Sequence, residues 1–325
     1  MSVSRLFPAL LLAAVVATLP ASAETLKTWR HGILEAKSDS GFIMMAERGG
    51  FAAKRGLKIE TSQMKAGATV IKALVAGELD SVEMGAAEAI VAGVRGADVK
   101  IVGCTWPGLP QVVMAKAEIK SPADLKGRTV AISQPGSLPD LLIRAVLDNY
   151  NVPVADVKFA SLGADIDRYK AMASGLTDAA VVSNEFQPIA PPQFKTLVEA
   201  RSVVPYFVRL CISTTGKVLS ERRNDAVAFV AAQMEALAHA TTNRAETTKL
   251  TREMTGAKSD DPRPEFIFDQ AIRYKQIDPT LALPLDKIDW MQNQFVKSGV
   301  LPKTVDVAKL VDPDVRVKAA ALVGK

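Results

Sequence analysis

Short apolar runs alternate along this chain with longer stretches in which apolar residues recur every three or four positions. The short runs are typical of buried strands, and the longer spacing predicts helices with one apolar face. Helical spacing occurs at residues 42–48, 70–76, 140–149 and 167–173. We expect strands at residues 25–30, 57–61, 81–84, 99–104, 112–115, 129–132, 157–160, 179–182, 196–197 and 206–213. Strands and helices in alternation, joined by short connections, predict an α/β fold.

The pattern changes near residue 221, after which only helical spacing remains. The expected helices cover residues 225–242, 245–255, 263–277 and 285–298, and a short turn follows at 308–310. An amphipathic helix must cover its apolar face with another element. We therefore expect this helical end to pack back on a sheet formed by the earlier part of the chain.

One segment of the chain has an internal echo. Ala73-Leu-Val-Ala-Gly-Glu-Leu-Asp80 recurs as Ala171-Met-Ala-Ser-Gly-Leu-Thr-Asp178. In each copy a glycine follows a helical stretch, where it can adopt the left-handed conformation that ends a helix, and an apolar strand follows the aspartate. The echo predicts two similar lobes, although the same Gly-x-x-Asp punctuation is common in α/β proteins generally.

The first 23 residues have the pattern of a secretory signal peptide. Arg5 precedes an apolar stretch at residues 6–19, and Ala21 and Ala23 form a small-x-small cleavage site. The apolar stretch is shorter than the roughly 20 residues that cross a bilayer, although an uncleaved membrane anchor is the alternative. We expect cleavage after Ala23 and a periplasmic protein. No cysteine follows that site, which argues against a lipid anchor.

Composition excludes several classes of protein. Of the 325 residues, 48% are hydrophobic, which is incompatible with a disordered chain. The 40 Lys and Arg against 35 Asp and Glu form no basic run, and aromatic residues do not interleave with them, so nucleic acid is not an expected partner. We find no phosphate-binding loop and no nucleophile or zinc motif, so we expect neither an enzyme nor a cofactor.

Cysteines and histidines are few. Cys104 and Cys211 both lie in apolar runs, and we interpret them as two buried thiols, with a disulfide between them as the alternative. His31 and His239 are the only histidines. No His-x-x-x-His or Cys-x-x-Cys spacing is present, so no structural metal is expected.

Four segments together resemble one family of proteins. They are residues 41–59, with Gly-x-Phe and Gly-Leu before a strand; residues 73–85, with Ala-Gly-Glu-Leu-Asp; residues 121–132, with Leu-Lys-Gly-Arg before a strand; and residues 171–182. In this order and separation, they resemble the SsuA/THI5-like, or NMT1-like, periplasmic substrate-binding proteins of ABC importers. That family handles sulfonates, nitrate, taurine and thiamine-precursor pyrimidines.

The resemblance implies a type II periplasmic-binding fold, in which two α/β lobes joined by two crossovers close on a small ligand. Lobe one would combine residues 24–117 and 206–325, and lobe two would cover residues 118–205. It also implies a monomer that delivers its ligand to an ABC permease in the inner membrane. A sensor that presents its ligand to a membrane receptor uses the same fold and stays an alternative. A THI5-type enzyme is more remote, because the cysteine-rich motif of those enzymes is missing.

In such a fold the ligand lies beyond the carboxyl ends of the strands, where helix N-termini offer free N–H groups. The candidate ligand-binding residues at such positions are His31, Gly32, Ser40, Gly67, Thr69, Gly85, Glu88, Trp106, Ser133, Gly136, Ser137, Asn184 and Glu185. Turn formation, helix capping or packing between the lobes would account for most of them equally well.

The charges at these positions suggest a class of ligand. Five acidic residues lie at candidate positions, namely Glu35, Asp39, Glu88, Asp165 and Glu185, whereas the only evident cation is Arg30, with His31 beside it. Oxyanions prefer arginine or lysine. We therefore expect a neutral or cationic nitrogen compound, such as a pyrimidine stacked on Trp106 and paired with Glu88 or Glu185. Sulfonate, taurine or nitrate is the alternative.

Overall fold

The computed structural model describes residue 1, residues 25–204 and residues 206–324. The signal peptide expected at residues 1–23 lies, except for Met1, outside the described residues. Within the described part of the chain, no helix combines the length and the apolar character needed to cross a membrane.

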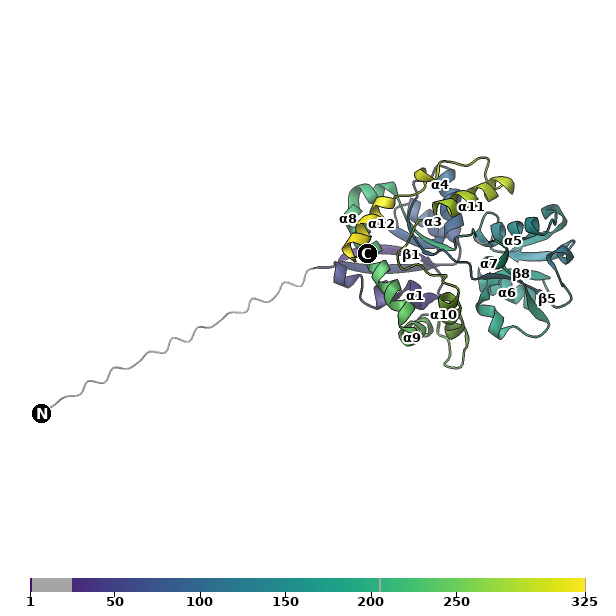
Figure 1. Cartoon of the computed structure of the whole chain (residues 1–325), viewed down its shortest axis with the longest axis horizontal. Helices are drawn as coiled ribbons and strands as arrows, with labels where there is room; N and C mark the ends of the chain where they lie inside the picture. Colours follow the sequence, from purple (N-terminus) through teal and green to yellow (C-terminus); the bar gives the residue numbers. More distant parts are fainter. Residues whose placement is uncertain (2–24, 205, 325) are drawn as a thin grey trace.

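One five-stranded sheet contains both early and late parts of the chain (Figure 1). Its strands are β1 (Lys27–Leu34), β2 (Leu57–Met64), β3 (Ser81–Gly85), β4 (Lys100–Trp106) and β10 (Leu210–Thr214). Their order is β2-β1-β3-β10-β4, with β1 parallel to β2 and β3, and β10 antiparallel to β3 and β4. We call this sheet, with the helices on it, lobe one.

The second sheet repeats the same arrangement with the middle of the chain. Its strands are β5 (Gln111–Lys116), β6 (Thr129–Ile132), β7 (Lys158–Ser161), β8 (Ala179–Ser183) and β9 (Phe194–Glu199), in the order β7-β6-β8-β5-β9. The echoed segments lead into β3 and β8, which are third in their sheets. Gly77 and Gly175 have φ of 79° and 80°, a conformation that favours glycine. We call this part lobe two, and the α/β expectation is confirmed.

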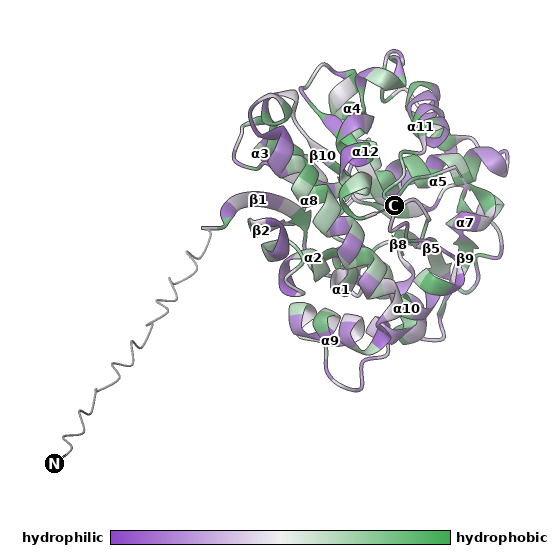
Figure 2. Ribbon diagram, turned by 60° about the vertical axis from the view of Figure 1, so that its left-hand side comes forward, coloured by the Kyte–Doolittle hydropathy of each residue, from purple (hydrophilic) through white to green (hydrophobic). Residues whose placement is uncertain are grey.

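Helices cover these sheets and form the end of the chain. They are α1 (Ser40–Ile43), α2 (Met45–Arg48), α3 (Gly67–Val75), α4 (Ala86–Val94), α5 (Leu138–Asn149), α6 (Asp165–Ala173), α7 (Ala200–Val203), α8 (Gly216–Thr242), α9 (Arg244–Thr255), α10 (Arg263–Arg273), α11 (Leu285–Lys297) and α12 (Pro313–Leu322). Short 3₁₀ turns are η1 (Ala53–Arg55), η2 (Pro122–Leu125), η3 (Val154–Asp156), η4 (Asn184–Ile189) and η5 (Val307–Lys309). Most helices carry both hydrophobic and hydrophilic residues, as expected when one face covers a sheet (Figure 2).

Three of these helices, α4, α7 and α12, were missed by the sequence pattern, and α7 has only four residues. Helix α4 is apolar at every position except Glu88 and Gly93, so it has no helical period to detect. Helix α12 follows Asp312, whose side chain accepts a hydrogen bond from the Val315 N–H, and begins with Pro313. That aspartate and proline form a start signal for a helix, which was available in the sequence.

The first crossover between the lobes lies earlier than expected. We placed the end of lobe one at residue 117, but β5 pairs with β8 and β9 in the second sheet. By sheet membership the crossover is therefore the segment between Trp106 and Gln111, and the chain returns between Val203 and Leu210. An apolar run such as 112–115 has the same pattern in either sheet, so the sequence gives no direct indication of which sheet contains it.

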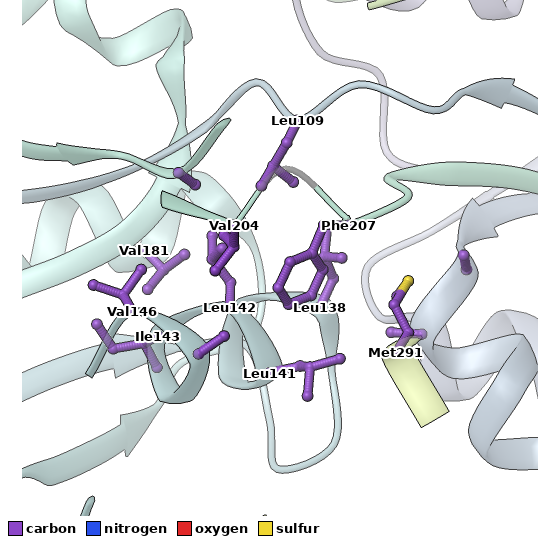
Figure 3. Packing of buried hydrophobic residues seen from close by; sticks show 14 of the residues in the cluster. Leu109, Leu138, Leu141, Leu142, Ile143, Val146, Val181, Val204, Phe207 and Met291 are labelled. Atoms are coloured by element: carbon purple, nitrogen blue, oxygen red, sulfur yellow. The ribbon is translucent and has the colours of Figure 1, made fainter. Parts of the chain in front are cut away.

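A shared hydrophobic cluster lies where the two crossovers meet the lobes (Figure 3). Leu109 of the first crossover and Phe207 of the second belong to it, together with Leu138 of α5 and Met291 of α11. Phe207 is fully buried and its ring packs edge-on against Trp290, with ring centroids 5.2 Å apart. The helical end of the chain thereby packs on both lobes beside the crossovers.

Cys104 and Cys211 form a disulfide, which corrects our interpretation of two buried thiols. The bond joins β4 to β10, the strands next to the two crossovers. These strands are neighbours in lobe one although 107 residues separate the cysteines. A long-range antiparallel pairing of this kind leaves no local sequence signal, which is why composition alone favoured free thiols.

We predict that the disulfide contributes substantially to stability. The C104A/C211A double variant should lose about 4 kcal/mol of unfolding free energy, because a cross-link over so long a loop restricts the unfolded chain. Urea unfolding of the oxidised protein and the variant measures the difference. Reductant in the urea should lower the stability of the natural chain and leave the variant unchanged; a difference below about 1 kcal/mol would contradict the prediction.

Candidate functional site

A cavity of about 240 Å³ lies between the two lobes. Lobe one contributes the segment Leu34–Ser38 after β1, the start of α3 at Gly67, and the β3–α4 junction with Gly85 and Glu88. Lobe two contributes Ser133, the start of α6 and Glu185. These are the carboxyl ends of strands and the N-termini of helices, where ligands of open α/β sheets bind.

Five of the candidate residues line this cavity. They are Gly67, Gly85, Glu88, Ser133 and Glu185. Each lies directly after a strand or in the first turn of a helix, so the rule that places ligands beyond strand ends selected positions at the cavity wall.

His31 and Gly32 do not lie at the cavity, because β1 extends to Leu34 and both residues are inside the strand. His31 is 2% exposed, its Nδ1 lies 2.8 Å from the Ser81 Oγ, and its ring centroid lies 4.9 Å from that of Phe229. Burial lowers the pKa of His31 to about 3, so the imidazole stays neutral. It is a core histidine.

Trp106 is also buried away from the cavity wall. Its ring packs edge-on against Phe42, with ring centroids 5.7 Å apart, and the guanidinium carbon of Arg209 lies 4.4 Å from the ring centroid. The aromatic face is therefore covered by Arg209. This corrects the expectation that Trp106 stacks on the ligand.

Five other candidates lie away from the cavity wall, and three of them take part in local hydrogen bonds. Ser40 accepts a hydrogen bond from the Lys37 N–H at 2.8 Å, and Ser137 accepts one from Asp140 at the start of α5. The Gly136 N–H donates to Asp140, Thr69 is exposed on α3, and Asn184 is buried beside the cavity without lining it. None of these five lies at the cavity wall.

The sequence analysis named Arg30 as the cation at the candidate positions, but Arg30 does not line the cavity. Arg30 lies in β1 before His31, and its Nη2 donates to Asp80 Oδ1 at 2.7 Å near the amino end of β3. The cavity instead contains Lys37, Arg168 and Arg209, and also Lys65 and Arg263. The sequence missed Arg209 because it precedes an antiparallel strand, and Lys37 because β1 was expected to end earlier.

Ion pairs organise the charges at the cavity. Arg209, 4% exposed, pairs with Asp39. Asp165 pairs with Arg168 of its own helix and with Lys37 of the opposite lobe. Burial alone would raise the pKa of Asp165, but the charges of Arg168 and Lys37 hold it well below its usual value. Asp165 is therefore ionised whenever the cleft has this arrangement.

A second contact joins the lobes beside this pair. The Ser38 backbone N–H donates to Glu185 Oε2 at 3.0 Å, from the end of β1 to the turn after β8. Arg168 also donates to the carbonyl groups of Val181, at 2.7 Å, and Gly163. The Arg168 side chain is thus held by backbone carbonyl groups of lobe two. Asp165 and Glu185 of lobe two contact Lys37 and Ser38 of lobe one.

Several buried polar atoms at the cavity have no hydrogen-bond partner within the described residues. They are Glu88 Oε2, Gln111 Oε1 and Arg209 Nη1. Burial raises the pKa of Glu88 to about 7. Buried polar groups are normally paired, since each unpaired one costs about 1–3 kcal/mol. This set therefore offers two acceptors and one donor to a bound molecule.

No cluster of three or more metal-binding side chains occurs within residues 25–204 and 206–324.

A family model described as NMT1/THI5 like matches residues 37–247. The chain belongs to the NMT1/THI5-like family. The match includes all of lobe two and most of the segments that line the cavity, and it confirms the resemblance carried by the four sequence segments. A comparison with curated proteins finds no match.

Solved structures similar to this NMT1/THI5-like chain share its fold. The periplasmic nitrate-binding protein NrtA from Synechocystis PCC 6803 is 18% identical, with a TM-score of 0.78, and the match covers 93% of this chain and 90% of that protein. The periplasmic aliphatic sulphonate binding protein SsuA from Escherichia coli is 20% identical, with a TM-score of 0.71, covering 88% and 92%. The alkanesulfonate-binding protein SsuA from Xanthomonas axonopodis pv. citri, bound to MOPS, is 18% identical, with a TM-score of 0.74, covering 88% and 98%. At these identities the likeness establishes the periplasmic-binding fold.

Glu83 of β3 provides a test of the electrostatics beneath the cavity. Burial raises the pKa of Glu83 to about 7, although a hydrogen bond from Thr105 opposes the shift. A carboxyl group whose pKa is higher in the folded state binds its proton more tightly there. The contribution of Glu83 to the unfolding free energy is therefore fully present at low pH. It decreases as the pH rises from about 4.5 to about 7, and above pH 7 it does not return.

We predict that Glu83→Gln gains stability over the natural chain as pH rises. The difference in unfolding free energy between variant and natural chain should shift by about 3 kcal/mol in favour of the variant between pH 4.5 and pH 8. Urea unfolding at several pH values measures it. Glu78→Gln, at an exposed position, controls for the loss of a charge; a difference for Glu83→Gln that is constant with pH would refute the prediction.

Proposed function

We propose that this protein is the periplasmic solute-binding component of an ABC import system, which captures a small organic molecule by closing its two lobes. Membership of the NMT1/THI5-like family and the shared fold with nitrate- and sulphonate-binding periplasmic proteins support this. The expected signal peptide would export it, and the closed form would be recognised by a permease in the inner membrane. We propose that it acts as a monomer, divided into the two lobes described above.

One observation carries the proposal: buried polar atoms without partners line a cavity to which both lobes contribute. Gln111 is 7% exposed and Arg209 is 4% exposed, so solvent reaches little of either side chain. A molecule bound between the lobes would pair with these atoms. It would supply hydrogen bonds that the described residues do not provide.

The favoured ligand is a neutral or cationic nitrogen compound, such as an aminopyrimidine. Its N–H groups would donate to Glu88 and Gln111, and a ring nitrogen or carbonyl would accept from Arg209 Nη1. Apolar side chains complete the cavity wall, among them Leu34 and Phe186, which stacks on Tyr169 with ring centroids 4.5 Å apart. These apolar side chains replace Trp106 as the surface against which a planar ring would pack.

Sulfonate, taurine or nitrate is the second candidate class. Lysine and arginine side chains line the cavity, which the sequence did not predict, and the similar solved proteins are named for such anions. However, Lys37, Arg168 and Arg209 are already paired with Asp39 and Asp165. Two further carboxyl groups, those of Glu88 and Glu185, lie among them, and both would be close to an anionic ligand.

A ligand would close the two lobes by shifting the population from an open form to the closed form. An open form would separate Lys37 from Asp165 and Ser38 from Glu185, whereas a ligand that touches both lobes adds binding energy only to the closed form. The hinge is the pair of crossovers over the cluster that contains Leu109 and Phe207.

We predict that ligand binding raises the melting temperature. At a concentration of about 100 Kd, a bound ligand adds about 2.7 kcal/mol to the unfolding free energy. A thermal-shift panel of aminopyrimidines, small amines, amino acids, taurine, alkanesulfonates and nitrate measures it, with the nitrogen compounds expected to give the shifts. Shifts from sulfonates or nitrate alone would contradict the favoured ligand, and no shifts with measurable turnover would contradict a binding protein.

We predict that Gln111→Leu lowers the affinity for whichever compound in the panel binds by roughly tenfold, since one hydrogen bond to a buried amide is lost. Isothermal titration measures the affinity. Gln193→Leu is the matched control, because this glutamine is exposed and does not line the cavity. An unchanged affinity for Gln111→Leu would show that the ligand binds elsewhere.

A further inference from the structure

The Glu88 carboxyl group lies among three helix N-termini. Glu88 is in the first turn of α4, α3 begins at Gly67, and α5 begins at Leu138. Burial raises the pKa of this carboxyl group, and the backbone N–H groups of Glu88 and Leu138 and the charge of Lys37 oppose that shift. N–H groups at helix N-termini are an environment suited to anions, and here a side chain of the protein itself receives them.

Two glycines make room for this carboxyl group. A Cβ atom at Gly67 would lie 2.9 Å from Glu88 Oε1, and one at Gly85 would lie 2.2 Å from Oε2. Real Cβ atoms do not approach oxygen so closely, so a side chain at Gly85 would displace the carboxyl group. The Glu88 carboxyl group therefore fills the space between the starts of α3 and α4.

The same space belongs to the cavity. Gly67, Gly85, Glu88 and Leu138 all line it. Two independent observations point to a ligand there: Gln111 and Arg209, both more than nine-tenths buried, line the cavity with polar atoms that have no partner among the described residues. A ligand that pairs with them would lie in the same cavity as the Glu88 carboxyl group.

We propose that the Glu88 side chain occupies the anion-binding position of the cleft and is the residue that excludes oxyanions from it. This inference rests on the proposed function, in that it takes the cavity as the ligand site. A sulfonate or nitrate entering the cleft would meet both the volume and the negative charge of Glu88 where it needs N–H donors. A nitrogen compound meets a hydrogen-bond acceptor instead.

The test compares Glu88→Ala, which empties the position, with Glu88→Gln, which keeps the volume and removes the charge. Glu78→Ala, at an exposed position in the turn before β3, is the matched control. Titrations with methanesulfonate, taurine and nitrate are run at pH 8, where a carboxyl group with a pKa of about 7 is mostly ionised. Circular dichroism and the melting temperature establish that each variant folds, and Glu88→Ser replaces Glu88→Ala if that variant does not.

We expect Glu88→Ala to bind at least one of these oxyanions at least tenfold more tightly than the natural chain does. Glu88→Gln should gain less, because its amide still fills the position, and Glu78→Ala should gain nothing. Oxyanion binding by the natural chain that equals that of Glu88→Ala would overturn the inference. So would a folded Glu88→Ala, or Glu88→Ser, that binds none of the three.

The test of the role of Glu88 can fail or succeed independently of the test of the proposed ligand class. If the natural chain binds no compound of the thermal-shift panel but Glu88→Ala binds methanesulfonate, the role of Glu88 is supported and the nitrogen ligand is not. If the natural chain binds an aminopyrimidine and Glu88→Ala gains no oxyanion, the proposed function is supported and the role of Glu88 is refuted.

Discussion

The buried charges at the cleft need partners, and the two lobes together supply them. Lys37 of lobe one and Arg168 of lobe two share Asp165, while Arg209 pairs with Asp39 within lobe one. A charge removed from water without a partner costs several kcal/mol, so these pairings fix the conformation of the segment after β1 and of the start of α6. The cavity has its shape because these segments are held in place.

A second constraint is the burial of apolar side chains at the two crossovers. Both crossovers pack over α5 and α11 in a single cluster, with Leu109 from one and Phe207 from the other (Figure 3). The Cys104–Cys211 bond joins the lobe-one strands from which the crossovers leave and to which they return. The disulfide thereby holds β4 and β10 together where the crossovers leave and re-enter lobe one.

Glu88 lies where these two constraints meet. The ion pairs satisfy most of the charges at the cleft, but the Glu88 carboxyl group has no ion-pair partner among the described residues. Backbone N–H groups of α4 and α5 and the charge of Lys37 influence it, and one of its oxygens has no hydrogen-bond partner there. Burial raises the pKa of Glu88, and the N–H groups at the helix N-termini only partly oppose that shift. The protein thus holds an internal carboxyl group at the position where helix N-termini would otherwise attract an external anion.

The sequence by itself determined the α/β class, the order of the strands along the chain and the family, because apolar period and the Gly-x-x-Asp echo are local properties. It also selected five residues that line the cavity, since each ends a strand, directly follows one or lies in the first turn of a helix, namely Gly67, Gly85, Glu88, Ser133 and Glu185. Tertiary structure alone decided that β5 belongs to the second sheet, that Cys104 bonds Cys211, and that Arg209 rather than Arg30 reaches the cavity. Each of these depends on the pairing of strands far apart in the sequence, and that pairing leaves no mark in the local pattern of apolar and polar residues.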